Sequence, residues 1–286
     1  MTVDGIGPIR RPFARANTLA GVVIASGTRA LVTGASRGIG RALAVALAQR
    51  GATVGLVART AEDLEKLAAQ LPGTHHVLVC DVAIRAAVQA AADEFVAAAG
   101  GLDVLVVNAG IAHYEPFALQ DVEKIEQMTQ VNWLGSVYTI KAALPHLLRA
   151  GHGHIVVMSS GAGLRSFPSA AAYSATKAAQ RMLAEALRHE CSGTGVSLTT
   201  VFPGEIATSL FDHQRSSMPS WYRGGEDAAP APELAERILK AIEHDRRHLH
   251  YRRSVKSMGI LNGISPRVAD VVLRRLRGRG AAPRKD

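Results

Sequence analysis

Apolar residues gather in short runs along this chain of 286 residues, and stretches with helical spacing separate the runs. Six runs have the length and composition of buried strands, and they span residues 29–33, 53–58, 75–80, 104–107, 155–158 and 197–202. The helical stretches span residues 41–50, 61–71, 84–99, 121–149, 173–192 and 233–243. Strands that alternate with helices predict an α/β fold, with a single doubly wound parallel sheet and helices on both faces.

Small and polar residues directly follow several of the predicted strands. In an open parallel sheet, ligands bind at the carboxyl ends of the strands. A ligand site is therefore predicted along this edge of the sheet, at Gly34, Arg59, Asp81 with Val82, and Asn108 with Ala109 and Gly110.

The loop after the first strand is rich in glycine and runs directly into a helix. Glycine lets the backbone approach a ligand closely, and the amides at a helix N-terminus attract phosphate. The spacing G-x-x-x-G-x-G differs from the common dinucleotide fingerprint G-x-G-x-x-G. Because a strand precedes the loop and a helix follows it, we predict a pyrophosphate cradle made by Gly34, Ser36, Arg37, Gly38, Ile39 and Gly40.

Two arginines bear on the choice of cofactor. In dinucleotide folds, an acidic residue about 20 positions beyond the glycine loop binds the ribose 2′-hydroxyl. Here Arg59 stands nineteen residues after Gly40, and Arg37 lies inside the loop. A guanidinium binds a 2′-phosphate that a carboxylate would repel. This placement predicts NADP as the cofactor, whereas two solvated surface arginines are the ordinary alternative.

A candidate proton-transfer pair follows the fifth predicted strand. Tyr173 and Lys177 are four residues apart, so a helix places them on one face. A nearby ammonium lowers the pKa of a Tyr hydroxyl, which then exchanges protons near neutral pH. Ser160, where the strand ends, can face the same cleft. The pattern Y-x-x-x-K is common, and alone it would favour an ordinary surface Tyr and Lys.

Seven short motifs occur in one order between residues 28 and 210. They are TGASRGIG (33–40), DV (81–82), NAG (108–110), Asn132, Ser160, YSATK (173–177) and PGEIAT (203–208). With this combination and spacing, the chain resembles a short-chain dehydrogenase/reductase of the Y-x-x-x-K type, which implies a Rossmann-like fold.

The resemblance also implies a mechanism. Tyr173 would exchange a proton with the oxygen of a carbonyl or an alcohol, and Ser160 would hydrogen-bond that oxygen. Lys177 would lower the pKa of Tyr173 and bind the nicotinamide ribose, while Asn132 would position a water that links Lys177 to solvent. A homodimer or homotetramer would form through the two long helices. Further cofactor contacts would come from the strand-end residues above and from Pro203, Gly204, Ile206 and Thr208.

The sequence divides into three parts. Residues 1–27 form an N-terminal extension, 28–250 an NADP-binding catalytic domain, and 251–286 a basic C-terminal extension. Residues 205–232 stand where the family carries a mobile substrate lid, although their polar composition also fits a disordered loop. After the helix at 233–243 we expect no closing strand. The lid segment contains Phe211, Met218, Trp221 and Tyr222. A lipophilic carbonyl or secondary alcohol is favoured by the apolar and aromatic pocket candidates His113, Tyr114, Phe117, Leu164 and Phe167.

The excess positive charge is confined to the C-terminal part. Residues 1–243 contain 21 Lys/Arg and 21 Asp/Glu, whereas residues 244–286 contain 12 and 3, so the whole net charge of +9 lies there. A basic amphipathic helix can lie on an anionic membrane. The favoured alternative is a helix that packs its narrow apolar stripe on its own domain. In residues 267–279 that stripe is Val268, Val271, Val272 and Leu276.

Other features exclude several classes of protein. No apolar run is long enough to span a membrane, and two lone cysteines, Cys80 and Cys191, fit a reducing compartment such as the cytoplasm. Three arginines within residues 10–15 resemble a weak twin-arginine export signal, which we interpret as a loose extension because the apolar stretch after it is short. No metal site is predicted, because neither acidic nor Cys residues accompany the H-x-H pairs at 152–154 and 248–250.

Two functions other than an enzyme remain as alternatives. One is a catalytically idle NADP-binding sensor, and the other is a membrane-surface binding protein that uses the basic tail. Retention of both Tyr173 and Lys177 favours the enzyme. No nucleic-acid-binding motif accompanies the basic residues, so nucleic acid is not an expected partner.

Overall fold

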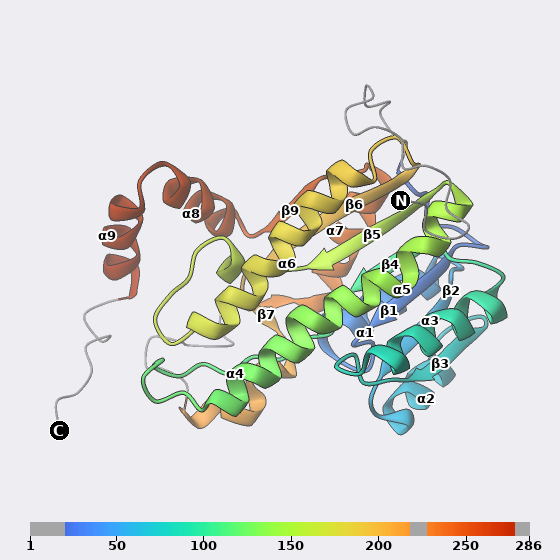
Figure 1. The fold of residues 1–286 in the computed structure, drawn as a ribbon, viewed down its shortest axis with the longest axis horizontal. Coiled ribbons are helices and arrows are strands. Elements are labelled where there is room, and N and C mark those ends of the chain that lie inside the picture. Colours follow the sequence, from blue (N-terminus) through green and yellow to red (C-terminus); the bar gives the residue numbers. More distant parts are fainter. Residues whose placement is uncertain (1–20, 218–227, 278–286) are drawn as a thin grey trace.

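The computed structural model describes residues 21–217 and 228–277. Seven parallel strands of this part form one sheet in the order β3-β2-β1-β4-β5-β6-β9 (Figure 1). Their bounds are β1 Arg29–Thr33, β2 Thr53–Ala58, β3 His75–Val79, β4 Val104–Val107, β5 Gly153–Met158, β6 Val196–Pro203 and β9 His248–Tyr251. Two short strands, β7 Ile206–Ala207 and β8 Ala229–Pro230, pair separately.

Helices cover both faces of the sheet, which confirms the predicted fold class. One face carries α1 Gly38–Gln49, α2 Ala61–Gln70 and α7 Ala231–Glu243. The other carries α3 Arg85–Ala99, α5 Gly135–Ala150 and α6 Ala171–Glu190, which lie in front of the sheet in Figure 1. The remaining helical segments are α4 Val122–Met128, η1 Thr129–Leu134, η2 Gly161–Gly163, η3 Ser209–Ser217, α8 Arg253–Ile264 and α9 Pro266–Arg277.

Burial on both faces explains why the strands read as continuous apolar runs. Successive side chains of a strand point to opposite faces. In β4, Val104 and Val106 therefore pack under α1 and α7, while Leu105 and Val107 pack under α3 and α5. All four of these residues are almost completely buried, so neither face of the strand tolerates a polar position.

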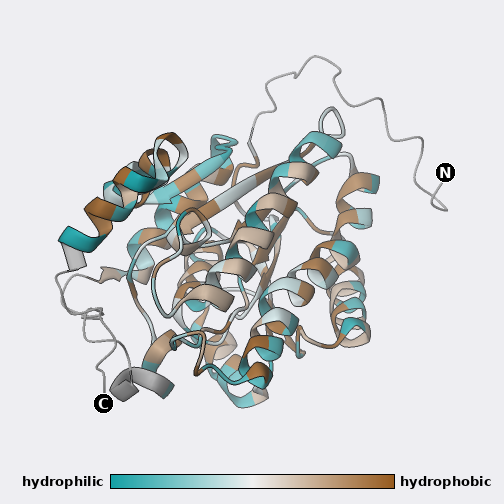
Figure 2. Ribbon diagram, turned by 60° about the vertical axis from the view of Figure 1, so that its left-hand side comes forward, coloured by the Kyte–Doolittle hydropathy of each residue, from teal (hydrophilic) through white to brown (hydrophobic). Residues whose placement is uncertain are grey.

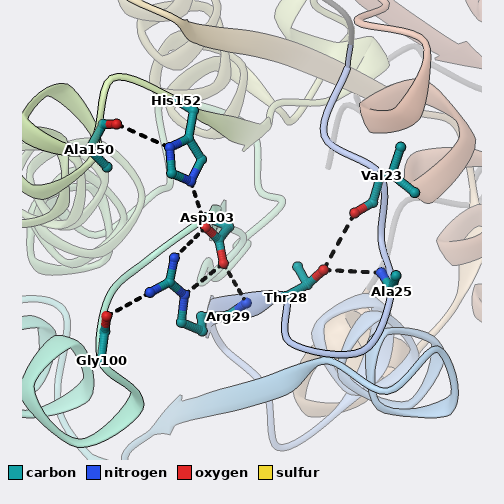
Figure 3. Close-up of polar contacts among 8 residues, drawn as sticks. All are labelled: Val23, Ala25, Thr28, Arg29, Gly100, Asp103, Ala150 and His152. Carbon is teal, nitrogen blue, oxygen red and sulfur yellow. Dashed lines mark hydrogen bonds and ion pairs between the residues drawn. The ribbon is translucent and has the colours of Figure 1, made fainter.

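A network of charged and polar groups holds the amino-terminal ends of β1 and β4 together (Figure 3). Arg29 donates from Nε to Asp103 Oδ2 at 2.8 Å and from Nη2 to Oδ1 at 2.6 Å. His152 Nε2 lies 2.9 Å from Asp103 Oδ1. Burial alone would raise the pKa of Asp103, but its hydrogen bonds with Arg29 and His152 hold that pKa below its usual value. These charges hold β1 and β4 together at the edge of the sheet opposite to the predicted ligand site.

The long helix predicted at 121–149 is interrupted by a π-helical turn, η1, between α4 and α5. The turn contains Asn132, whose backbone oxygen accepts hydrogen bonds from Ser136 Oγ at 2.6 Å and Gln180 Nε2 at 2.9 Å. A π-helical turn leaves a carbonyl without its usual helical partner, and such turns are frequent at functional sites. Through the backbone oxygen of Asn132, the interruption therefore links α5 and α6 by hydrogen bonds, which helical periodicity alone did not predict.

The expectation of no closing strand after α7 is wrong. Residues His248–Tyr251 form β9, which pairs in parallel with β6 in the register Thr200↔His248 to Pro203↔Tyr251. Leu249 and Tyr251 point inward and are buried, whereas the His250 ring stacks on Phe202 with ring centroids 5.0 Å apart. A four-residue strand with histidines at alternate positions gives no apolar run, so the sequence pattern did not reveal it.

Candidate active site

A cleft of about 1070 Å³ opens at the carboxyl ends of the strands. The structure brings almost all of the predicted site residues to its walls, because each follows a strand or lies at the start of a helix. The residues of the glycine loop that line it are Gly34, Ser36, Arg37, Gly38 and Ile39. The others are Arg59, Asp81, Val82, Asn108, Ala109, Gly110, Ser160, Tyr173, Lys177, Pro203, Gly204, Ile206 and Thr208. Gly40 and Asn132 are buried behind the wall.

The loop between β1 and α1 requires glycine at specific positions. Gly34 and Gly38 adopt φ angles of +68° and +57°, which residues with a side chain rarely adopt. A Cβ atom at Gly40 would lie 2.1 Å from the Gly34 carbonyl oxygen and 2.6 Å from Asn108 Nδ2. No side chain caps the start of α1, where Gly38 and Ile39 line the cleft. This close backbone turn and uncapped helix N-terminus fit a pyrophosphate.

Asn108 holds this loop in place. Its Nδ2 donates to the backbone oxygens of Thr33 at 2.9 Å and Gly34 at 3.3 Å. Its backbone amide donates to Thr33 Oγ1 at 3.0 Å. The carboxyl ends of β1 and β4 are thereby joined, and the side-chain amide of Asn108 supports the cradle from below.

At one end of the cleft, two guanidinium groups face the solvent. Arg37 at the N-cap of α1 and Arg59 after β2 are both exposed and both line the cleft. The carboxylate of Asp63, in the first turn of α2, lines the same cleft. These side chains come from two adjacent strand ends, so a ligand that lies across β1 and β2 meets both arginines.

Ser160, Tyr173 and Lys177 lie together at the floor of the cleft. Ser160 caps η2, where its Oγ accepts a hydrogen bond from the Ala162 amide at 3.1 Å, and it also hydrogen-bonds the Tyr173 hydroxyl. Lys177 Nζ donates to the Met158 carbonyl at 3.0 Å and lies 5.8 Å from the centroid of the Tyr173 ring. Tyr173 is 5% exposed and Lys177 is 4% exposed.

Burial changes the protonation behaviour of both residues. It raises the pKa of Tyr173 to about 12, against the smaller opposing effect of the Ser160 hydrogen bond. It also lowers the pKa of Lys177 to about 7. The expected decrease in the Tyr173 pKa is therefore wrong for this arrangement. Burial destabilises the phenolate form of Tyr173 more than the hydrogen bond with Ser160 stabilises it. The ammonium of Lys177 lies over the ring of Tyr173.

The side chain of Asn132 hydrogen-bonds neighbouring backbone groups and one hydroxyl. Its Oδ1 accepts from the Ile111 amide at 2.8 Å, while its Nδ2 donates to the Ile111 oxygen at 2.9 Å and to Thr176 Oγ1 at 3.1 Å. A Cβ atom at Gly110 would meet Asn132 Oδ1 at 3.2 Å and Lys177 Nζ at 3.4 Å. The side chains of Asn132 and Lys177 thus both approach Gly110, and the role of Asn132 in a water chain stays a prediction.

Aromatic side chains form the wall next to Tyr173. The Tyr114 ring lies edge-on to Tyr173 and Phe167, with centroids 5.5 Å and 5.4 Å apart, and 4.8 Å from the Phe211 ring. His113 joins them as a lining residue. Of the other predicted pocket residues, Phe117 is 66% exposed, and neither it nor Leu164 lines the cleft. Met218, Trp221 and Tyr222 lie outside the described residues.

The C-terminal hairpin, which consists of α8 and α9, forms a further wall of the cleft that the sequence did not predict. Residues Val255 and Met258 of α8 and Leu273 of α9 line the cleft. The helix predicted from 267 is present as α9, but its packed side differs from the predicted stripe. Val268 and Val271 are 49% and 40% exposed, whereas Ala269 is completely buried. Leu276 lies outside the described side chains.

Arg165 fastens the hairpin to the loop that follows Ser160. Its Nη1 donates to Asn262 Oδ1 at 2.7 Å, and its Nη2 forms an ion pair with Asp270. A Cβ atom at Gly161 or at Gly204 would meet a Val255 methyl group at 3.2 Å. These close approaches pack α8 directly against both loops at the floor of the cleft.

The part of the chain that the structure describes contains neither a metal-ligand cluster nor a membrane-spanning helix. No group of three or more His, Cys, Asp or Glu residues lies together there as metal ligands would. No helix in that part has the length and apolar character needed to cross a membrane.

The sequence and the structure match known oxidoreductases. The model of the family described as short chain dehydrogenase matches residues 28–219. D-threitol dehydrogenase of Mycolicibacterium smegmatis is 38% identical over 187 residues, which are 64% of this chain and 72% of that protein. Glycine betaine reductase ATRR of Emericella nidulans is 37% identical over 209 residues, which are 71% of this chain but only 16% of that protein.

Solved structures give the same result. A 3-ketoacyl-(acyl-carrier-protein) reductase from Brucella melitensis, complexed with NADH, has a TM-score of 0.71 at 26% identity and covers 79% of this chain and 96% of its own. An alcohol dehydrogenase from the archaeon Thermococcus sibiricus, complexed with 5-hydroxy-NADP, has a TM-score of 0.68 at 29% identity, with coverages of 78% and 94%. The two share the fold but hold different nicotinamide cofactors.

Proposed function

Because this chain belongs to the short-chain dehydrogenase family, we propose that it is an NADP-dependent oxidoreductase for a lipophilic carbonyl compound or secondary alcohol. It is an oxidoreductase of a family that binds nicotinamide cofactors. The observation that carries the proposal is that half-buried Ser160 lies with buried Tyr173 and Lys177 at the floor of a cleft that also contains the glycine cradle.

In the reductive direction, Tyr173 acts as the general acid. A hydroxyl with a pKa near 12 is protonated at neutral pH, so it can donate a proton to the oxygen of a bound carbonyl. Ser160 orients the same oxygen through a hydrogen bond. The bound reduced cofactor supplies the hydride that reaches the carbonyl carbon. Lys177, with a pKa near 7, can release a proton near neutral pH and so help to restore that of Tyr173.

The glycine cradle and the ends of β2 and β6 would hold NADP. The backbone of Gly34, Gly38 and Ile39 would bind the pyrophosphate. Arg37 and Arg59 support the choice of NADP over NAD, because two guanidiniums outweigh the single Asp63 carboxylate beside a 2′-phosphate. The remaining predicted contacts, including Asp81, Val82, Ala109, Gly110, Pro203, Gly204, Ile206 and Thr208, border the rest of the cleft.

The substrate end supports a lipophilic compound. Tyr114, Phe167 and Phe211 form one aromatic wall, and the hairpin adds Met258 and Leu273. An apolar wall of this kind gains free energy by removing hydrocarbon from water. The lid predicted at 205–232 would cover this end through η3, which contains Phe211.

We also propose a homodimer or homotetramer in the cytoplasm. The long α4–α5 and α6 helices would form the contact, and the exposed Met182 on α6 offers an apolar point for it. Buried, unpaired Cys80 and Cys191 fit a reducing compartment. Light scattering at micromolar concentration should give an integral multiple of the 30.2 kDa chain, and a monomer would contradict this assembly.

Steady-state assays with a panel of ketones and alcohols test the activity. We expect turnover with NADPH or NADP⁺ on at least one lipophilic member of the panel, and weaker turnover with NADH or NAD⁺. A protein that binds NADPH by fluorescence titration but turns over no member of the panel would favour the idle sensor instead.

A further inference from the structure

Large apolar side chains are exposed on the C-terminal hairpin, whose other residues line the cleft. Among the residues that the structure describes, eleven large apolar side chains are exposed, and four of these lie on the hairpin. Monomeric proteins rarely expose contiguous apolar surface unless it binds something. The four are Ile260 and Ile264 on α8, and Val268 and Val271 on α9.

The hairpin has two different faces. Its inner face packs on the loops at the floor of the cleft through Val255, Met258 and Leu273. Its outer face carries Ile260 and Ile264, one helical turn apart and 53% and 78% exposed. Figure 1 shows the hairpin standing out from the body after β9, and Figure 2 shows apolar and hydrophilic positions alternating along both helices. The outer apolar side chains therefore leave much of their surface open to solvent.

The charge of the hairpin selects the kind of partner. Residues 253–277 contain one acidic residue, Asp270, which is already paired with Arg165. A second copy of the hairpin would bring like charges together, whereas an anionic lipid surface attracts basic side chains and accepts apolar ones. The basic residues of this range are Arg253, Lys256, Arg267, Arg274, Arg275 and Arg277.

We propose that the outer face of the hairpin docks on an anionic lipid bilayer, with the mouth of the cleft next to the bilayer surface. Arg165 ties both helices to the loop after Ser160, so docking of the hairpin also orients the catalytic floor. A lipophilic substrate then enters the cleft from the bilayer without crossing water. The docking is inferred from the hairpin alone, whereas the entry of substrate from the bilayer rests on the proposed function.

Sedimentation with vesicles tests the docking. The full chain should sediment with vesicles of phosphatidylcholine and phosphatidylserine, remain in solution with phosphatidylcholine alone, and dissociate in high salt. The double variant Arg274→Glu with Arg275→Glu should bind at least about thirty-fold more weakly, since each basic residue near the surface contributes about fivefold. Ile264→Asp should also weaken binding, because it removes an inserted side chain.

Matched controls lie elsewhere on the protein. Arg85→Glu, in the exposed first turn of α3, reverses a charge, and Val79→Asp on β3 replaces an apolar residue that is 57% exposed. Strand β3 is at the sheet edge opposite β9, from which the hairpin continues. Both controls should bind vesicles like the parent chain. A parent chain that stays in the supernatant at low salt, or hairpin variants that bind like the controls, would overturn the proposal.

Further measurements separate the docking from the proposed activity. Turnover of a water-soluble ketone should be the same in the parent and in the Arg274→Glu/Arg275→Glu variant. Turnover of a lipophilic ketone dissolved in anionic vesicles should fall in the variant alone. Vesicle binding without any turnover would refute the proposed function and leave the docking intact. Self-association that needs Ile264 in the absence of lipid would instead identify the outer face as a contact between two copies.

Discussion

The glycine-rich end of the cleft and its aromatic end are built in different ways. At the first, consecutive residues 33–40 make the cradle, and Asn108 fixes it with contacts to Thr33 and Gly34. At the second, Tyr114 meets Phe167 and Phe211, and Arg165 reaches Asp270, which is 105 residues away in the sequence. The cradle is a local backbone structure, whereas the substrate wall exists only when distant segments pack together. Changes at the two ends should therefore have separable effects.

The largest effect on turnover is expected at Tyr173, where the glycine-rich end and the aromatic end of the cleft meet. Tyr173→Phe removes the hydroxyl that donates the proton but keeps the ring that packs on Tyr114. Turnover should fall about 10²- to 10⁴-fold while the affinity for NADPH is preserved. Single-turnover rates and fluorescence titration measure the two quantities. Tyr138→Phe on α5 is the control, and turnover of Tyr173→Phe within a factor of two of the parent would remove Tyr173 from the mechanism.

Arg59→Asp should change only the glycine-rich end. The substitution exchanges a group that attracts a 2′-phosphate for one that repels it, so the ratio of kcat/KM for NADPH to that for NADH should fall roughly 10- to 100-fold. Both constants should be measured in both proteins. Arg85→Asp is the control for added negative charge, and equal kcat/KM values for the two cofactors in the parent would contradict the NADP assignment.

Leu273→Ala should change only the aromatic end. Loss of apolar contact in the cleft should lower kcat/KM for a bulky lipophilic ketone about tenfold and leave that for a small ketone unchanged. The affinity for NADPH should not change. Val268→Ala, on the exposed face of the same helix, is the matched control. Equal losses for small and bulky ketones would show that Leu273 does not contact the substrate.

The smallest expected effect is on the stability of the fold, and it measures the burial of Lys177 at the floor of the cleft. Folding lowers the pKa of Lys177 from about 10.5 to about 7, so between these pH values the unfolded chain holds a proton that the folded protein has lost. Stability from this residue therefore rises with pH across that window. Tyr173, with its pKa raised to about 12, opposes this only above pH 10.

Lys177→Met should abolish the part of the rise in stability with pH that comes from Lys177. Thermal unfolding followed by circular dichroism from pH 7 to 10 should show a smaller increase in Tm for Lys177→Met than for the parent. Lys141→Met, at an exposed position of α5, should follow the parent. Identical curves for all three proteins would show that Lys177 is not desolvated.

By itself, the sequence determined six of the seven strands that the structure shows in the main sheet, the glycine cradle and the positions of most of the candidate site. The predicted strands at 29–33, 53–58 and 104–107 coincide with β1, β2 and β4, because a parallel strand buried on both faces must be continuously apolar. Gly34 and Gly40 could be assigned to the cradle since their backbone and packing requirements are local. All the predicted catalytic residues except Asn132 then reach the cleft, because parallel strands end at one edge.

Only the tertiary structure decided the rest. Strand β9 forms because β6 offers it an edge, and its alternating histidines give no signal of their own. The hairpin lines the cleft because Arg165, Gly161 and Gly204 accept its inner face, so the apolar stripe seen in the sequence of α9 is not the buried one. The pKa of Tyr173 rises, where a neighbouring ammonium alone predicted a fall, because desolvation depends on everything packed around the hydroxyl. Periodicity and spacing record what a segment requires locally, whereas burial and partners depend on segments far away in the sequence.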